Sequence, residues 1–186
     1  MVYQKHGDNY MKLKITVGIF LLSLIGTFGL MLYNISQMDS ETMILCAENE
    51  GGILIPSQAC EYYMYNLRNV KKDVEELSNG AGLSFILNGN NKEKKYKIAV
   101  FFISNGLDVN GINNYGDYNL TPIYSAVLLN DVEMVKFLLK HGADLNIKPP
   151  SINMTPLEFA RSLQKKEPSV DRNEILEFLS NRTKNT

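Results

Sequence analysis

The sequence has few of the residue types that catalytic and metal sites need. Its 186 residues include no tryptophan, only two histidines and only two cysteines. Zinc sites draw on clusters of Cys and His, so such chemistry has little to work with. No phosphate-binding loop, GxGxxG, GxSxG, HExxH or paired CxxC motif is present. We therefore predict a protein that is not an enzyme, with no catalytic residue, no metal ligand, no cofactor and no small-molecule substrate.

An excess of basic charge is also missing. The chain has 19 Lys and Arg against 20 Asp and Glu, which gives a formal net charge of −1. Proteins that bind nucleic acid carry a basic footprint, so we expect no nucleic-acid partner. A hydrophobic fraction of 45% suits one soluble domain plus one apolar segment.

Three polar features are better explained as surface than as sites. His141 falls near the end of a predicted helix, where a cation or a polar group is favourable. The acidic residues of Asp73–Glu76 lie among lysines and predict a solvated helix face. The run Lys92–Lys97 contains Glu93 and predicts a second solvated face, with an electrostatic contact to a partner as the alternative.

The longest apolar run is Ile15–Tyr33, which has 19 residues and no charge. About 20 residues cross a bilayer, so the run predicts a transmembrane signal anchor rather than a core helix. No A-x-A-like site follows it, which favours an uncleaved anchor over a cleaved signal peptide. Lysines precede the run, and Asp39 and Glu41 follow it. The positive-inside rule then keeps residues 1–14 in the cytoplasm, with Met11 as an alternative start, and exports the rest.

Residues 34–56 are predicted to form an exported polar tether. Cys46 and Cys60 bracket a loop at its end. In an exported chain two cysteines most simply form one disulfide, and two buried free thiols are the alternative. Closing a loop of about 15 residues stabilises a fold by roughly 3 kcal/mol in the chain-entropy model.

The stretch Asn119–Asn146 predicts two helices joined by a tight turn. Thr121 is a good N-cap residue, and Pro122 follows at the first helical position. Asn130 tolerates the left-handed backbone that the stop of the first helix needs, and Gly142 suits the end of the second. Apolar residues recur at helical spacing on both helices: Ile123, Ala126, Val127, Val132, Val135, Leu138 and Leu139.

This stretch resembles an ankyrin repeat. TPIYSA at Thr121–Ala126 and GADLN at Gly142–Asn146 match the repeat signatures. TPLEFA at Thr155–Ala160 begins 34 residues after the first TP, and GLDVN at Gly106–Asn110 begins 36 residues before GADLN. The spacing is close to the 33-residue ankyrin period. Asn119 and Asn153 stand where ankyrin repeats usually have glycine.

The resemblance implies an all-α ankyrin-repeat solenoid of about four repeats over residues 57–182, followed by a tail at 183–186. Ser57–Gly80 is interpreted as a degenerate first repeat that caps the stack. Its helices centre on Tyr62–Leu67 and Val70–Leu77. The next repeat has an inner helix at 83–87 and an outer helix at 95–104. In the last repeat the inner helix runs on, and a closing helix at 174–179 follows, with Asp171 or Ser169 as its N-cap.

Ankyrin repeats bind proteins through the tips of their hairpin loops and through their inner helices. Carried onto this sequence, the resemblance implies one set of partner-binding residues: Asn113, Asn114, Tyr115, Asp117, Tyr118, Leu120, Leu128, Ser151, Ile152 and Met154.

A second resemblance covers most of residues 50–182. An apolar segment followed by LIPSQACEYYMYN, DVEELSNGAGLSF and the repeats is similar to ankyrin immunity proteins paired with type VI secretion phospholipase effectors. It implies a bacterial inner-membrane protein, anchored through residues 15–33, whose ankyrin domain lies in the periplasm. There it would bind and neutralise a secreted phospholipase toxin. The alternative is a membrane-tethered ankyrin adaptor of an envelope complex.

Overall fold

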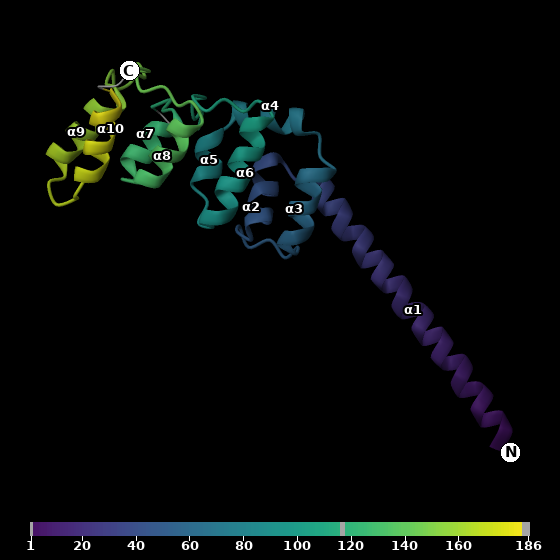
Figure 1. Ribbon diagram of the computed structural model, residues 1–186. Coiled ribbons are helices and arrows are strands. Elements are labelled where there is room, and N and C mark those ends of the chain that lie inside the picture. The colour runs from purple at the N-terminus through teal and green to yellow at the C-terminus, as the bar shows by residue number, and fades with distance from the viewer. Residues whose placement is uncertain (1, 116–117, 184–186) are drawn as a thin grey trace.

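The computed structural model describes residues 2–115 and 118–183, and all the regular elements in these residues are α-helices (Figure 1). A long helix projects from one end of a row of shorter helices. The helices are α1 Val2–Gln37, α2 Ser40–Glu48, α3 Ser57–Asn66, α4 Val70–Asn79, α5 Leu83–Leu87, α6 Lys92–Ser104, α7 Pro122–Leu128, α8 Val132–Lys140, α9 Pro156–Lys166 and α10 Asn173–Thr183.

The shorter helices pack as hairpins that stack side by side. α5 packs on α6, α7 on α8 and α9 on α10, and the first helix of each hairpin packs on the first helix of the next. The turns inside the hairpins form one edge of the stack, where the Asn130 side chain donates to the carbonyl of Asp171 at 2.8 Å. The described parts of the two long loops, residues 106–115 with 118–121 and residues 142–155, form the opposite edge. This is the predicted all-α solenoid.

The residues predicted to adopt a left-handed backbone do so. Asn130 has φ 56° and Gly142 has φ 97°, so each residue occupies the left-handed region at the end of its helix. Asn119 and Asn153 have φ 48° and 46°, which explains why asparagine stands at the usual glycine position. Asparagine is the non-glycine residue that best tolerates this conformation, so these four positions are dictated by local stereochemistry.

The predicted helix starts have different N-cap hydrogen bonds in the structure. Thr155 closes a capping box with Glu158, in which each side chain bonds the other residue's backbone N–H. Thr121 occupies the N-cap of α7 as predicted, yet its buried hydroxyl makes no capping bond. At α6 the Asn91 side chain accepts from Lys94 N, so the helix begins at Lys92 rather than at residue 95.

The disulfide between Cys46 and Cys60 is present, with the two Cα atoms 5.8 Å apart. It joins α2 to α3, and both sulfur-bearing residues are fully buried. The two-thiol alternative is therefore not what the structure has.

The prediction of a polar tether over residues 34–56 is wrong. Residues 34–37 complete α1, and only Met38 and Asp39 separate α1 from α2. α2 buries Met43, Ile44 and Ala47 against α3 and α4. The apolar run between Met43 and Ala47 is too short to stand out in a polar stretch, but it is long enough to pack one face of a nine-residue helix.

This helix also changes the predicted first repeat. The sequence paired α3 with α4, whereas in the structure α3 packs on α2 and the Cys46–Cys60 bridge joins them. α4 instead occupies the edge where the later repeats have their long loops, since Asn114 N donates to Gly80 O just after α4. The N-terminal cap of the stack is therefore α2 with α3.

Two predicted solvated faces are partly buried. Lys95 is buried, and its Nζ donates to Leu87 O at 2.8 Å, at the end of α5. Lys94 Nζ donates to Ala47 O at 2.7 Å, at the end of α2. These lysines satisfy carbonyls that a helix end leaves without partners. Lys92, Glu93 and Lys97 remain exposed, as expected.

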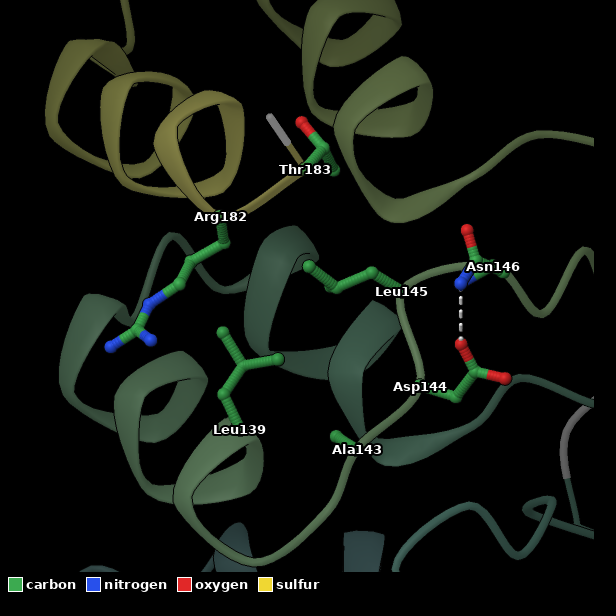
Figure 2. Close-up of a pocket in the computed structure, with 7 residues that line it drawn as sticks. All are labelled: Leu139, Ala143, Asp144, Leu145, Asn146, Arg182 and Thr183. Carbon is green, nitrogen blue, oxygen red and sulfur yellow. Dashed lines mark hydrogen bonds between the residues drawn. The ribbon is translucent and has the colours of Figure 1, made fainter. Parts of the chain in front are cut away.

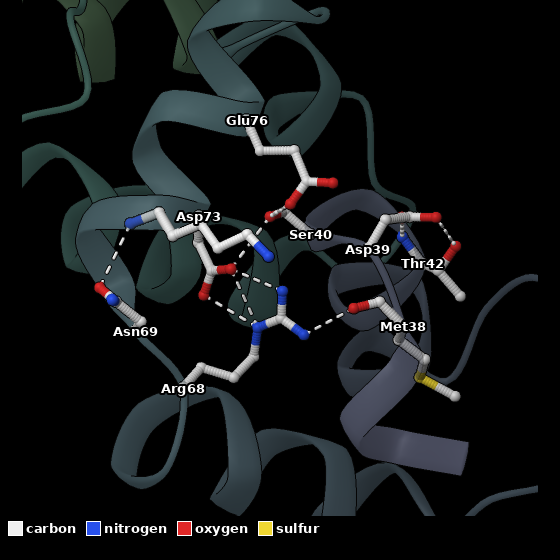
Figure 3. A network of polar contacts seen from close by, with 9 residues as sticks. Met38, Asp39, Ser40, Thr42, Arg68, Asn69, Asp73 and Glu76 are labelled. Atoms are coloured by element: carbon white, nitrogen blue, oxygen red, sulfur yellow. Dashed lines mark hydrogen bonds and ion pairs between the residues drawn. The ribbon is translucent and has the colours of Figure 1, made fainter. Parts of the chain in front are cut away.

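Asp73 is also buried, in a polar network at the junction of α1 and α2 (Figure 3). Arg68 Nε lies 2.9 Å from Asp73 Oδ2, and Arg68 Nη1 donates to Met38 O at 2.7 Å. Ser40 Oγ donates to Asp73 Oδ1 at 3.1 Å. The bond to Asp73 raises the pKa of the Arg68 guanidinium. The network fixes the turn between the long helix and the stack.

The last repeat has the long inner helix that was expected, α9, which runs for 11 residues against seven in α7. Of the two proposed caps, Asp171 accepts from Asn173 N at 3.0 Å, where α10 begins. The closing helix is longer than predicted and continues to Thr183, into the predicted tail.

Candidate functional site

The two long loops on one edge of the stack carry most of the predicted partner-binding residues. Asn113 N donates to Leu120 O at 2.9 Å, which closes the first loop into a hairpin. Tyr115 stands at its tip and is 69% exposed. Asp117, which was also predicted there, lies outside the described residues.

Asn113 and Asn114 are bound within the chain. The Asn113 side chain accepts from Tyr115 N at 2.9 Å. Asn114 donates from its backbone to Gly80 O at 3.0 Å and from its side chain to Ser78 O at 3.0 Å. The two asparagines therefore shape the hairpin and hold it against the end of α4.

Tyr118 lies where the hairpin returns to α7, and its side chain is 60% exposed. The hydroxyl of Ser151, in the next long loop, donates to Tyr118 O at 2.5 Å. Farther along the same loops Asp144 N donates to the Asn110 side chain at 2.9 Å. These bonds tie neighbouring loops together, so the edge that carries Tyr118 is held as one surface.

Three of the predicted partner-binding residues are less available. Leu120 and Ile152 are half-buried and pack against the core. Met154 is half-buried as well, and its carbonyl lies 2.6 Å from the Tyr124 hydroxyl. Burial raises the pKa of Tyr124 to about 12, so this hydroxyl stays protonated as a donor. These residues support the loops rather than forming their outer surface.

At the other end of α7 the side chain of Leu128 is 50% exposed, and Leu129 beside it is exposed too. Their neighbours Ala126 and Val127 are fully buried. Adjacent exposed apolar side chains of this kind can contribute to a binding surface when a larger apolar patch continues from them. Tyr115, Tyr118 and Leu128 are thus the large hydrophobic side chains of the predicted set that are exposed; we refer to these three as the exposed triad.

Tyr115 also borders an acidic hollow of about 350 Å³ that the sequence analysis did not identify. Its lining comes from α2, α4, α5 and the hairpin: Asp39, Glu41, Thr42, Leu45, Glu76, Phe85 and Tyr115. Burial raises the pKa of Glu41, and the charge of Glu41 in turn raises the pKa of Tyr115. The hollow escaped sequence reasoning because its residues are far apart in the chain and α2 was taken for a tether.

Ile112 was missed as well, although it is exposed in the same hairpin beside Asn113. The sequence could have indicated Ile112 as an exposed apolar residue, because it is the one aliphatic residue between Gly111 and Tyr115 in a polar loop.

A larger hollow of about 430 Å³ lies between the end of α8, the loop after it and α10 (Figure 2). Aliphatic side chains of Leu139, Ala143 and Leu145 line it on one side, with Arg182 across from them. Asp144 accepts from the Asn146 side chain at 3.1 Å, which shapes the loop. Within the described residues no group of three or more His, Cys, Asp or Glu could hold a metal ion.

His141 has the capping role that was predicted. It is the C-cap of α8, its Nδ1 lies 2.8 Å from Phe137 O, and its ring packs on the Phe137 ring. A histidine engaged in this way takes part in the helix end and is not aimed at any of the hollows.

Comparison with known families agrees with this geometry. A family model described as ankyrin repeats, in three copies, matches residues 83–185, which is more than half of the chain. The match begins at the first residue of α5 and so takes in the three hairpins from α5 to α10. The α2–α3 cap lies before it. No curated protein matches the chain.

Proposed function

Because the chain belongs to the ankyrin-repeat family, whose repeats typically form non-catalytic modules for protein interaction, we propose that it binds a protein partner through the exposed triad. We propose further that the partner is a secreted phospholipase toxin of a type VI secretion system, which this protein neutralises as an immunity protein. The sequence resemblance to that class of ankyrin proteins supports the identity of the partner.

The observation that carries the proposal is the accessibility of Tyr115, Tyr118 and Leu128 on a fold whose loops are otherwise bonded together. Tyr115 and Tyr118 remain exposed on the edge formed by the long loops, and Leu128 remains exposed at the opposite end of α7. Large side chains held on a rigid fold can bury area in a partner without a large loss of conformational entropy. The side chains available there supply shape and apolar area, which suits inhibition by covering an active site.

The long helix gives the proposal its location. Met11–Gln37 is long and apolar enough to cross a membrane, and an 18-residue apolar stretch of it is not buried in the protein. We propose that α1 anchors the chain in a bacterial inner membrane with the ankyrin domain in the periplasm. A toxin that attacks the membrane from that side would meet an inhibitor already concentrated there.

The test is survival of bacteria that express the candidate toxin in the periplasm. The protein tested as the toxin is the product of the neighbouring gene, expressed with and without the full chain. A chain in which Leu22→Arg and Ile25→Arg interrupt the apolar span is the matched control. Rescue by the natural chain and loss of rescue by the control support the proposal. Lysis in both cases, with both proteins present, would instead favour the adaptor role.

A further inference from the structure

α1 enters the stack without a linker. Ile35 is fully buried and Met31, one turn earlier, packs against the core, while the residues from Met11 to Leu30 lie on the surface. Three residues after Ile35, the bond from Arg68 to Met38 O fixes the turn into α2. The last turns of α1 therefore belong to the folded body.

The length of α1 then sets how close the body lies to a bilayer. The uncharged run starts at Ile15, and from there to Leu30 the helix has 16 residues. At 1.5 Å per residue this part is about 24 Å long, whereas the hydrocarbon layer is about 30 Å thick. A bilayer crossed by α1 thus reaches the level of Met31, against which the body already packs. Any tilt of α1 shortens its reach across the bilayer and brings the body closer still.

The surface of the body that faces this bilayer includes the loop between α2 and α3. α2 follows α1 after two residues and turns back, so its end returns toward the side from which α1 arrives. Figure 1 shows this loop at the lower edge of the stack, on the side toward which α1 extends. The loops that carry Tyr118 and Ser151 lie on the opposite edge.

The loop is apolar and held in place. Gly51–Pro56 reads GGILIP and contains no charged residue. Ile53 and Ile55 pack against the core, while the Leu54 side chain between them is fully exposed. The disulfide from Cys46 to Cys60 closes the base of the loop. An aliphatic side chain held at the tip of a braced, uncharged loop has nothing to pack against within its own chain.

We propose that loop 51–56 inserts Leu54 into the lipid of the membrane that α1 spans, as a second contact of this protein with the bilayer. The inference rests on α1 crossing a membrane and does not depend on which protein the exposed triad binds. Because the loop carries no charge, the contact is with the acyl-chain boundary, where aliphatic side chains gain most, rather than with a particular headgroup. Two contacts, α1 and the loop, would hold the stack in one orientation. The edge that carries Tyr118 and Ser151 would then face away from the lipid.

The natural chain has no tryptophan, so a single introduced indole reports on one position. The variants are Leu54→Trp at the loop and Leu22→Trp within α1. Tyr118→Trp, on the opposite edge of the stack, is the matched exposed control. Each full-length protein is reconstituted into phosphatidylcholine vesicles whose acyl chains carry bromine, which quenches indoles in contact with lipid. We expect Leu54→Trp and Leu22→Trp to lose most of their emission, and Tyr118→Trp to keep nearly all of it.

Emission from Leu54→Trp as bright as that from Tyr118→Trp would overturn the proposal. An unquenched Leu22→Trp would overturn it too, because α1 would then not lie in the bilayer. A blue shift of Leu54→Trp that follows protein concentration rather than brominated lipid would show that a second copy covers the loop. Toxin binding enters none of these measurements, so failure of the proposed function would leave this result unaffected.

Discussion

The ammonium nitrogen of Lys95 lies 2.8 Å from the carbonyl oxygen of Leu87, so a buried lysine on α6 completes the end of α5. Lys95→Met removes this donor and leaves a carbonyl without a partner in the core, which costs about 1–3 kcal/mol. Thermal unfolding of the full chain in detergent should show a lower Tm, by about 2–4 °C per kcal/mol. Lys97→Met, on the exposed side of the same helix, should leave the Tm close to that of the natural chain. Equal Tm values for the two variants would contradict this role for Lys95.

The ion pair between Arg68 and Asp73 should be costly to break from one side. Both side chains are nearly inaccessible to solvent, so Asp73→Ala leaves a buried guanidinium uncompensated, at a cost of about 3–5 kcal/mol. The double variant Arg68→Met with Asp73→Leu should be less destabilised than Asp73→Ala alone, because it leaves no isolated charge. Thermal melts of the single and double variants measure this order. A double variant less stable than Asp73→Ala would show that the charges themselves are needed.

Stability should fall as the pH rises through the range in which Glu48 ionises. Burial raises the pKa of Glu48 from 4.5 to about 7, with a further contribution from Glu50. Between these values the folded chain keeps a proton that the unfolded chain has released, so raising the pH favours unfolding. Because part of the change is complete below pH 5, we expect a loss on the order of 2 kcal/mol between pH 5 and pH 8.

Glu48→Gln tests this pH dependence directly. It should be more stable than the natural chain at pH 8 and should show a smaller loss of stability from pH 5 to pH 8. Glu93→Gln is the control, since Glu93 is fully exposed and paired with Lys97. The quantity to compare is the change in Tm with pH for each protein. An unaltered slope in Glu48→Gln would rule out Glu48 as its source.

Removing the disulfide should loosen the N-terminal cap. Cys46→Ala with Cys60→Ala takes away a bridge between residues 14 apart, which in the chain-entropy model costs roughly 3 kcal/mol. Thiol alkylation with and without reduction establishes that the natural chain is bridged, and thermal unfolding measures the cost. If the natural chain alkylates fully before reduction, the bridge is absent and the predicted cost does not apply.

The exposed triad should dominate binding to the partner. Tyr118→Ala with Leu128→Ala removes two accessible anchors and should weaken binding by at least about tenfold, since such anchors each contribute more than about 1 kcal/mol. Both side chains are at least half exposed, so the Tm should change little. Val100→Ala, which is exposed on α6, is the control and should bind normally. Titration calorimetry with the purified toxin gives the affinities; a well-folded double variant with unchanged affinity would place the contact elsewhere.

The parts of the fold that the sequence predicts well are those dictated by local backbone chemistry. Asn130 and Gly142 mark helix ends because few other residues accept a positive φ, and Pro122 marks a helix start. These marks recur at the ankyrin spacing, so the stack from α5 onward could be predicted from the chain alone.

What the sequence does not reveal is which distant segments pair. α2 has a hydrophobic run of only a few residues, and its partners α3 and α4 are identified only by long-range packing. Lys95 and Asp73 look like surface residues because their partners, Leu87 O and Arg68, are not visible in a charge pattern. For the same reason the sequence does not reveal that Asn113 bonds within the hairpin and that Asn114 bonds to the end of α4.

The two-residue turn at Met38 and Asp39 is too short to act as a flexible linker between α1 and the stack. A domain on a flexible linker can reach any point of a hemisphere around its membrane anchor and can therefore bind targets over a range of heights. This domain would instead stay at a fixed height above the membrane and in a fixed tilt. Its search for a partner would then be limited to lateral diffusion and rotation in the membrane plane. A target would be caught only if it presents its own surface at that height, as a protein working on the same lipid does.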